Sequence, residues 1–470
     1  MTGELNPKLQ IAWVPEFIYV GNSFAPHQAL VCDAAGVIGK VVEASTLTDE
    51  KRINLPRRAI LPGMVNAHSH AFQRVIRGRT EYRTANQRDS FWTWRELMYS
   101  AATRLTPEDV YDASRMAFLE MALSGITAVG EFHYLHHAPD GSAYDDPNLL
   151  AQQVIHAAGD VGLRIALLRV AYARSGFQTE ANPKQARFIE SDAELYLKNF
   201  EALTASDTAW VGIAPHSVRA VPLNYLKRVI SYAHEHDLKV HMHVAEQPAE
   251  VSACIEEYGR TPVALLQTEA ILNQQFTAVH AIHVTPKAIA SLAETGAMVC
   301  ACPTTERNLG DGVVPADEYL KHGVSLCLGT DSHAQIDLFE DAREMEYHLR
   351  LQKLERAVLD DQSQVSVFNS QGLATRLFDC ATVNGARSIG APGGSLAPGQ
   401  PADFFTVDLN DPSIAGAAND DLLPAIVFSA SRAAIREVVV NGKPIVSEGQ
   451  HLMQEDVVER FKELQKRLWE

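Results

Sequence analysis

The feature that most constrains the fold is an alternation that fills the middle of the chain. From residue 60 to about 335, short apolar or β-branched runs alternate with longer segments of helical periodicity. This pattern is typical of repeated βα units that build a parallel sheet. Several longer segments begin near Pro or Asp, as helices commonly do: 107–124, 192–203, 222–236 and 286–295. Eight runs are candidate strands and predict a closed (β/α)8 barrel of the TIM type: Ile60–Val65, Ala128–Glu131, Leu163–Val170, Trp210–Ala214, Lys239–Val244, Thr277–His280, Ala297–Cys302 and Val324–Thr330.

The two ends of the chain follow a different pattern. Residues 1–59 and roughly 390–450 are rich in short strand-like pieces separated by Gly, Pro and Asp, including the turn dipeptide Asn441-Gly442. We expect both ends to meet in one small β-sandwich beside the barrel. The predicted division is 1–59 plus 386–455 for the composite β-sandwich, 60–385 for the barrel and 456–470 for an exposed terminal helix without chemistry.

Charge and composition exclude several classes of partner. The formal net charge of -17, without a basic stripe, argues against binding to nucleic acid. No apolar run approaches the roughly 18 residues that a membrane span needs, and the first residues lack the pattern of a signal peptide. The cysteines are scattered through apolar segments, which is typical of reduced core thiols in a cytoplasmic protein. We expect Cys300-x-Cys302 to pack in the core, because its spacing suits neither a zinc knuckle nor a redox pair.

The strongest functional signal is a His-x-His pair at the end of the first predicted strand. His68 and His70 are two residues apart, so in an extended chain their imidazoles point to the same side and can reach one cation. The carboxyl end of the strands is where barrel enzymes keep their active sites. Taken alone, such a pair is as often structural as functional.

Three other predicted strands end in residues of the same kind. His243 and Glu246 follow one strand, His280 ends the next, and Asp331 follows the last. Imidazoles and a carboxylate on one rim suit zinc, or iron or manganese at a similar site, and leave a position for water. A bound cation lowers the pKa of water to roughly 7 and so favours hydrolysis at neutral pH. We expect Asp331 to accept the proton of water, Glu246 to carry protons to a leaving nitrogen, and His280 to stabilise developing charge.

This order of residues on a barrel resembles the amidohydrolase superfamily over nearly the whole chain. Within it, the sequence is most similar to the formimidoylglutamate deiminases, enzymes of histidine degradation. The resemblance rests on long strings: His68-Ser69-His70-Ala71-Phe72-Gln73-Arg74, Asp89 to Tyr99, Glu131-Phe132-His133-Tyr134 with His136-His137, His216-Ser217-x-Arg219-Ala220 and Thr305-Glu306-x-Asn308-Leu309-Gly310-Asp311-Gly312.

The resemblance implies a zinc-dependent hydrolase of C–N bonds in linear amidines. It implies one divalent cation, expected to be Zn²⁺, on His68, His70, His243 and Asp331, with Glu246, His280 and Asp331 catalytic. It also implies that the substrate, a small dicarboxylate, is bound by Gln73, Arg95, Tyr134, His216 and Arg219, and that the chain forms a homodimer. Read on their own, Arg95 and Arg219 offer guanidinium forks that suit carboxylates.

Other interpretations of these residues remain open. Arg95 could pair with Glu96 on a surface helix, and Arg219 could cap a carbonyl. His133, His136 and His137 are expected to surround the site more than to bind a second metal, and Trp92 and Trp94 to pack under a loop. The nearest rival function is another deaminase of the superfamily, acting on a purine, pyrimidine or guanidino compound. A non-catalytic barrel kept for assembly is the remote one.

Overall fold

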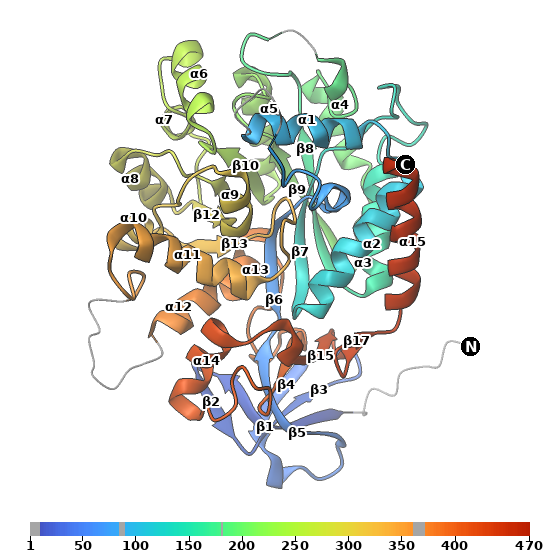
Figure 1. The fold of residues 1–470 in the computed structure, drawn as a ribbon, viewed down its shortest axis with the longest axis vertical. Helices are drawn as coiled ribbons and strands as arrows, with labels where there is room; N and C mark the ends of the chain where they lie inside the picture. The colour runs from blue at the N-terminus through green and yellow to red at the C-terminus, as the bar shows by residue number, and fades with distance from the viewer. Residues whose placement is uncertain (1–9, 84–89, 180–181, 361–371) are drawn as a thin grey trace.

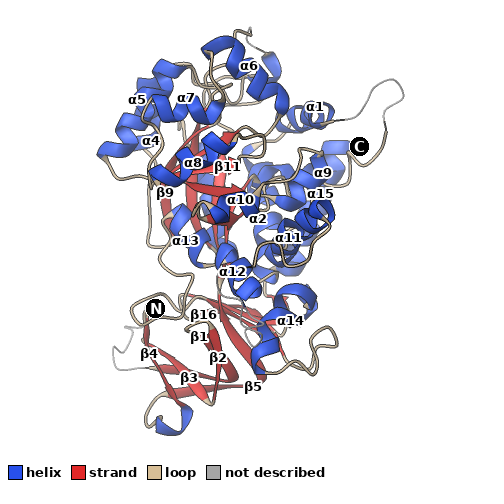
Figure 2. Ribbon diagram, turned by 90° about the vertical axis from the view of Figure 1, so that its left-hand side faces the viewer, coloured by secondary structure: helices blue, strands red, loops and turns tan. Residues whose placement is uncertain are grey.

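The computed structural model describes residues 10–83, 90–179, 182–360 and 372–470, and it contains a nearly closed barrel of eight parallel strands. Each strand pairs with the next in sequence, from β6 to β13, and helices surround them (Figures 1 and 2). The predicted fold class is therefore confirmed. The barrel strands are β6 (Met64–Ser69), β7 (Ile126–His133), β8 (Arg164–Ala171), β9 (Ala209–Pro215), β10 (Val240–Val244), β11 (Phe276–His280), β12 (Met298–Ala301) and β13 (Leu326–Leu328).

One predicted strand, Ile60–Val65, is wrong. Its first residues belong to β5 (Lys51–Pro62) in a different sheet, and β6 begins only at Met64. Gly63 separates the two strands, and a Cβ placed there would lie 2.2 Å from the Thr127 side chain. A residue without a side chain is needed where the chain leaves one sheet and enters the other so close to β7.

The barrel closes between its first and last strands. Asn66 on β6 receives a hydrogen bond from the Thr330 backbone N–H at 3.0 Å and donates one to the Thr330 hydroxyl at 2.7 Å. Next along this seam, the Asp331 N–H donates to the His68 carbonyl at 3.0 Å, and the His70 N–H donates to the Asp331 carbonyl at 3.1 Å. The seam therefore places the first and last predicted ligands side by side.

The helices occupy the expected connections. The predicted helices beginning at Pro107, Asp192, Pro222 and Pro286 correspond to α2, α4, α5 and α8, and α2 opens with a Thr106–Asp109 capping box. The helices are α1 (Phe91–Ala102), α2 (Pro107–Leu123), α3 (Leu149–Val161), α4 (Ala193–Glu201), α5 (Leu223–Glu235), α6 (Pro248–Tyr258), α7 (Pro262–Thr268), α8 (Pro286–Thr295), α9 (Pro303–Leu309), α10 (Ala316–Lys321), α11 (Leu338–Lys353), α12 (Gly372–Ala381), α13 (Val383–Ile389), α14 (Leu422–Ser429) and α15 (Gln454–Trp469). Among the described residues, every helix is too short or too polar to cross a bilayer.

Both ends of the chain meet in a second sheet at the end of the barrel opposite α1 (Figure 1). There β5 pairs in parallel with β1 near the N-terminus and antiparallel with β14 near the C-terminus. Asn441 and Gly442, both with positive φ, form the turn between β15 and β16. The strands are β1 (Ile11–Val20), β2 (Ser23–Pro26), β3 (Gln28–Cys32), β4 (Ile38–Glu43), β5, β14 (Phe404–Asp408), β15 (Ile435–Val440), β16 (Lys443–Ser447) and β17 (Gln450–His451).

The terminal helix α15 is less exposed than the sequence predicted. It begins at Gln454, and its apolar side chains Val457, Phe461, Leu464 and Leu468 are buried. The helix lies beside α2 (Figure 1), to which it is tied by an ion pair between Arg115 and Asp456 at 2.7 Å. The charged residues of the helix indicated its outward face alone. The apolar residues on its other face pack against the barrel domain.

A buried ion pair offers a test of the fold. Arg169 on β8 donates to both carboxylate oxygens of Glu190, at 2.6 and 2.9 Å, and both side chains are almost inaccessible. Replacing Arg169 by Met should lower the free energy of unfolding by about 3–5 kcal/mol, because Glu190 would remain as an uncompensated buried charge. Thermal unfolding at neutral pH measures this effect.

The pH dependence of the same pair gives a second readout. Burial raises the pKa of Glu190, but His136 and Arg169 outweigh it and lower the pKa to about 2. The depressed pKa stabilises the fold above the ordinary carboxyl pKa of about 4.3, and this contribution is lost as the pH falls toward 2. The Arg169→Met variant should lose the part of that acid sensitivity that comes from the ion pair. The control is Arg228→Met, which removes an exposed pair with Glu194 and should change stability little; equal effects of both variants would contradict the prediction.

Candidate metal centre and active site

Four predicted ligands converge at the carboxyl end of the barrel strands. His68 lies on β6 and His243 on β10, while His70 directly follows β6 and Asp331 lies shortly after the end of β13. The Nε2 atom of His68 is 3.2 Å from that of His70 and 3.2 Å from that of His243. Asp331 Oδ1 is 3.2 Å from His70 Nε2 and 3.5 Å from His68 Nε2. Four ligands held about 2.05 Å from a tetrahedral zinc ion would be separated by about 3.3 Å, so the cluster has the size of a site for one metal ion.

Hydrogen bonds at the other ring nitrogens orient these imidazoles. His70 Nδ1 is 2.9 Å from the Phe132 carbonyl, and His243 Nδ1 is 3.1 Å from the His216 carbonyl. A carbonyl accepts only from a protonated Nδ1, which leaves the Nε2 lone pair free for a cation. The Nε2 atoms of His70 and His243 therefore present lone pairs toward the cluster, which a bound cation would satisfy.

Burial keeps the cluster in the protonation state that a metal needs. It lowers the pKa of His68 to about 3 and that of His243 well below its usual value, so both rings are neutral at pH 7. Burial alone would raise the pKa of Asp331, but the neighbouring imidazoles of His68 and His70 outweigh it and hold the pKa well below the usual value. The donor set therefore includes the neutral imidazoles of His68 and His243 and one carboxylate.

Glu246 and His280 lie beside this cluster. His280 Nε2 is 3.7 Å from both Glu246 Oε1 and Asp331 Oδ2. Burial lowers the pKa of His280, but the carboxylates of Glu246, Glu306 and Asp331 outweigh it and raise the pKa to about 10. Burial also raises the pKa of Glu246, although His280 opposes that shift. The site thus holds a cationic imidazole and a carboxyl group with increased proton affinity.

The five predicted substrate-binding residues line one cavity together with these groups. Gln73 donates to the Tyr134 hydroxyl at 2.7 Å, and His216 packs against Tyr172 with ring centroids 4.6 Å apart. The buried Nη1 atoms of Arg95 and Arg219 have no hydrogen-bond partner. The cavity is lined by His70, Gln73, Phe91, Trp94, Arg95, Met98, Tyr99, Tyr134, Tyr172, Phe188, His216, Arg219, His243, Glu246, His280, Leu309 and Asp331.

The two arginines do not make the structural contacts considered as alternatives. Glu96, a possible partner of Arg95, pairs instead with Lys184 at 2.5 Å. Arg95 donates to the Tyr99 hydroxyl, and its guanidinium lies over the Tyr99 ring. Arg219 is partly buried, and its Nη1 atom is buried without a hydrogen-bond partner. Two guanidinium groups with free donors inside a cavity favour an anionic ligand.

The other histidines and the tryptophans lie around the site. His136 and His137 bond to the Val170 and Ile189 carbonyls at 2.8 and 3.0 Å, and within the described part of the chain neither they nor His133 join a cluster that could hold a metal. Trp92 is 41% exposed. Trp94 packs against the hydrophobic core and also lines the cavity. Asp89, the first residue of the string that carries these tryptophans, lies outside the described residues.

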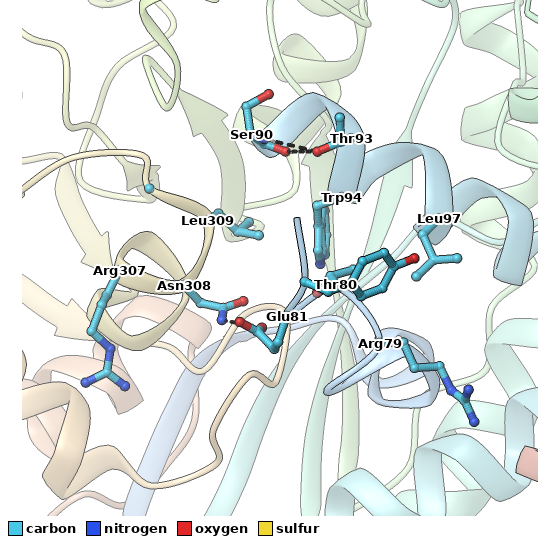
Figure 3. Close-up of a pocket in the computed structure, with 12 residues that line it drawn as sticks. Arg79, Thr80, Glu81, Ser90, Thr93, Trp94, Leu97, Arg307, Asn308 and Leu309 are labelled. Carbon is cyan, nitrogen blue, oxygen red and sulfur yellow. Dashed lines mark hydrogen bonds between the residues drawn. The ribbon is translucent and has the colours of Figure 1, made fainter. Parts of the chain in front are cut away.

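A larger outer cavity of about 330 Å³ adjoins the inner one, which has only about 40 Å³ of free space. Trp94 and Leu309 line both cavities. Figure 3 shows Glu81 of the outer cavity bonded to Asn308, whose amide donates at 2.8 Å. Ligand pockets usually measure about 300–1,000 Å³. The inner cavity must therefore widen to admit a substrate. Trp94 and Leu309 form the wall between the inner and the outer cavity.

Sequence reasoning assigned no role to two buried carboxylates of the site. Glu131, at the end of β7, accepts hydrogen bonds from the Ser69 hydroxyl at 2.5 Å and the Ala71 N–H at 2.7 Å. It therefore fixes the backbone around His70. Glu306 on α9 lies 3.3 Å from His280 Nδ1 and orients that ring. Both lie in the strings that carry the family resemblance, but their places at or after the end of a predicted strand, which many structural residues share, indicated no role for them.

Comparison with known proteins places this architecture among characterised relatives. The model of the amidohydrolase family matches residues 59–445. A formimidoylglutamate deiminase from Pseudomonas aeruginosa is 38% identical over 91% of this chain and 93% of that protein. A 5-methylthioadenosine/S-adenosylhomocysteine deaminase from Haloarcula marismortui is 26% identical over 92% of this chain and 90% of its own. The crystal structure of an amidohydrolase from Brucella melitensis superposes with a TM-score of 0.86 at 32% identity, covering 98% of this chain and all of the other.

Proposed function

Because this chain belongs to the amidohydrolase family, we propose that it hydrolyses N-formimino-L-glutamate to N-formyl-L-glutamate and ammonia, a step in histidine degradation. The chain is a metal-dependent hydrolase that acts on C–N bonds, and its similarity to a formimidoylglutamate deiminase supports this substrate. The observation that carries the proposal is the pair of arginines, Arg95 and Arg219, whose unpaired guanidinium nitrogens face the cavity beside the histidine cluster.

The cavity suits an acidic aliphatic amidine. The substrate carries two carboxylates, and two guanidinium groups can bind carboxylate through charge-assisted hydrogen bonds even in a chain of net charge -17. Gln73, Tyr134 and His216 add hydrogen-bonding groups along the same wall. With its carboxylates held by these residues, the substrate would present its formimino carbon to Asp331, Glu246 and His280.

We propose zinc as the cofactor, held by His68, His70, His243 and Asp331. Three imidazoles and a carboxylate at these separations are a typical zinc donor set. When bound, the cation would supply Lewis-acid activation of water at neutral pH. The buried free cysteines of the described chain fit a reducing cytoplasm, and the proposed homodimer rests on family resemblance alone.

The residues beside the cluster divide the proton transfers. Water adds to the formimino carbon, and Asp331 takes up a proton from it. The carbon–nitrogen bond then breaks, and Glu246 delivers a proton to the departing nitrogen, which leaves as ammonia while the formyl oxygen remains. The raised pKa of Glu246 suits a group that must hold and release this proton. His280, whose pKa is raised to about 10, would stabilise negative charge developing near the reacting carbon.

The main rival is a deaminase that acts on a purine, pyrimidine or guanidino compound. The relative from Haloarcula marismortui, named for a nucleoside substrate, belongs to this class. A base would gain from the aromatic lining but would leave two buried guanidinium groups without carboxylates. A non-catalytic barrel is disfavoured, because the complete predicted donor set converges with Glu246 and His280 beside it.

Replacing Arg219 by Met should mainly impair binding of the substrate. A hydrogen bond to a charged group contributes about 1.5–3 kcal/mol, so KM should rise roughly 10- to 150-fold while kcat changes less. Steady-state ammonia release measures both constants. The control is Arg228→Met, which removes an exposed guanidinium that pairs with Glu194 at 2.6 Å; an equal rise in KM there, or none in Arg219→Met, would contradict the carboxylate role.

The direct test of the function is ammonia release by zinc-loaded protein. N-formimino-L-glutamate would be assayed beside guanine, cytosine and N-carbamoyl-L-glutamate. Efficient release from the first compound alone supports the proposal. Turnover of a base with no reaction of the formimino compound would retain the hydrolase but overturn its proposed substrate.

A further inference from the structure

A second group of possible metal ligands adjoins the first. The ligand atoms of His280, Cys302 and Asp331 lie within 4.8 Å of one another, and all three side chains are buried. Asp331 belongs to both groups, whereas His280 and Cys302 belong only to this one. These three residues are called the cysteine subsite below.

His280 presents an unused nitrogen at this subsite. Its Nδ1 lies 3.3 Å from a Glu306 oxygen, while its Nε2 has no hydrogen-bond partner. The oxygens of Glu246 and Asp331 are each 3.7 Å from Nε2, which is too far for a hydrogen bond. A buried ring nitrogen without a partner calls for an explanation such as an ion at that position.

The surrounding charge favours a second cation. Glu246, Glu306, Asp311 and Asp331 act on one another through space, and burial with this repulsion raises the pKa of Asp311 to about 9. These carboxylates lower the electrostatic cost of placing a cation beside them.

The sulfur of Cys302 determines which cation fits. Thiolate is a soft ligand that selects zinc and similar ions over magnesium or calcium. Sequence spacing predicted that Cys302 packs in the core, and it is indeed fully buried. The other two ligands of the subsite come from different strands. His280 ends β11, and Asp331 follows β13.

We propose that the cysteine subsite binds a second, inhibitory soft cation when zinc exceeds one equivalent. The ion would take His280 Nε2, an Asp331 oxygen and the Cys302 sulfur, and both the cationic imidazole and the thiol release a proton to solvent on binding. It would withdraw His280 and part of Asp331 from the reaction. The inhibitory effect rests on the proposed catalytic roles of these residues, but binding of the ion does not depend on the substrate.

Counting bound metal tests the subsite. Full-length protein carrying one equivalent of zinc is dialysed against rising zinc, and bound zinc is measured by elemental analysis. The wild type should take up a second, weaker ion, and Cys302→Ser should bind that ion at least tenfold less tightly while keeping the first. The matched control, Cys254→Ser on α6, removes a buried thiol that lies in no such cluster among the described residues and should keep both ions. Cys302→Ala serves if the serine variant does not fold.

A spectroscopic readout identifies the ligand. Cadmium added to the one-zinc protein should produce a thiolate charge-transfer absorption in the wild type and in Cys254→Ser, but not in Cys302→Ser. Excess zinc should inhibit ammonia release by the wild type at concentrations at least tenfold lower than for Cys302→Ser. One bound zinc only, a second ion indifferent to Cys302, or cadmium binding without the thiolate band would overturn the subsite. Zinc counts and the cadmium band need no substrate, so failure of the proposed function would be recognised separately.

Discussion

Replacing Asp331 by Ala is expected to reduce kcat by about 10⁴-fold or more, because one side chain serves as both metal ligand and proton acceptor. Its carboxylate lies 3.2 Å from His70 Nε2 and 3.7 Å from His280 Nε2, so its loss opens the metal cluster and removes the proposed base together. Ammonia release and bound zinc should be measured on the same preparation. Ammonia release and bound zinc should both fall, and we expect the same result for His68→Ala.

A second substitution separates the two roles. Asp331→Asn keeps the size of the side chain and one oxygen ligand but cannot accept a proton at neutral pH, so zinc should be retained better than turnover. Asp337→Asn, in the loop that follows and at the start of α11, is the matched control and should leave kcat nearly unchanged. Substantial turnover by a metal-free Asp331 variant would contradict the proposed mechanism.

Replacing Glu246 by Gln should lower kcat by about 10²- to 10⁴-fold, the usual range for a lost general acid–base group. Glutamine preserves the shape of the side chain but carries no proton to the leaving nitrogen. Because Glu246 is outside the four-residue metal cluster, zinc content should stay at one ion per chain. Steady-state kinetics with elemental analysis distinguish this pattern from that of Asp331→Ala.

The control for Glu246 is Glu256→Gln on the exposed face of α6. It makes the same chemical change at a carboxylate away from the cavity, and kcat should remain close to that of the wild type. If Glu246→Gln kept kcat within a few-fold of the wild type, another group would have to carry the proton.

The barrel could be predicted because its signals are local and repeated. Strand-like runs end in His243, His280 and Asp331, and parallel strands of a barrel must present their carboxyl ends at one rim. The start of the barrel was misplaced because residues 59–65 read as one apolar run. The chain changes sheets within that run, and only the long-range fit of Gly63 against Thr127 makes the division visible.

Residues of the site could be predicted only where a metal-binding or catalytic residue type stood at the end of a predicted strand. Glu131 and Glu306 act through partners on other elements, Ser69 and His280, so no spacing in the sequence could assign their contacts. Cys302 was predicted to pack in the core for the same reason, because its possible partners lie on other elements. The catalytic and ligand roles themselves remain predictions, although the side chains concerned do share one cavity or one cluster.

The seam between β6 and β13 sets a point in chain synthesis before which the proposed metal site cannot exist. Two of its four donors, His68 and His70, come from the first barrel strand, and Asp331 follows the last. Synthesis must therefore proceed through Asp331 before the donor set is complete. Binding of the metal ion by all four donors must follow that point, and a barrel that terminated before it would leave the histidines without their carboxylate.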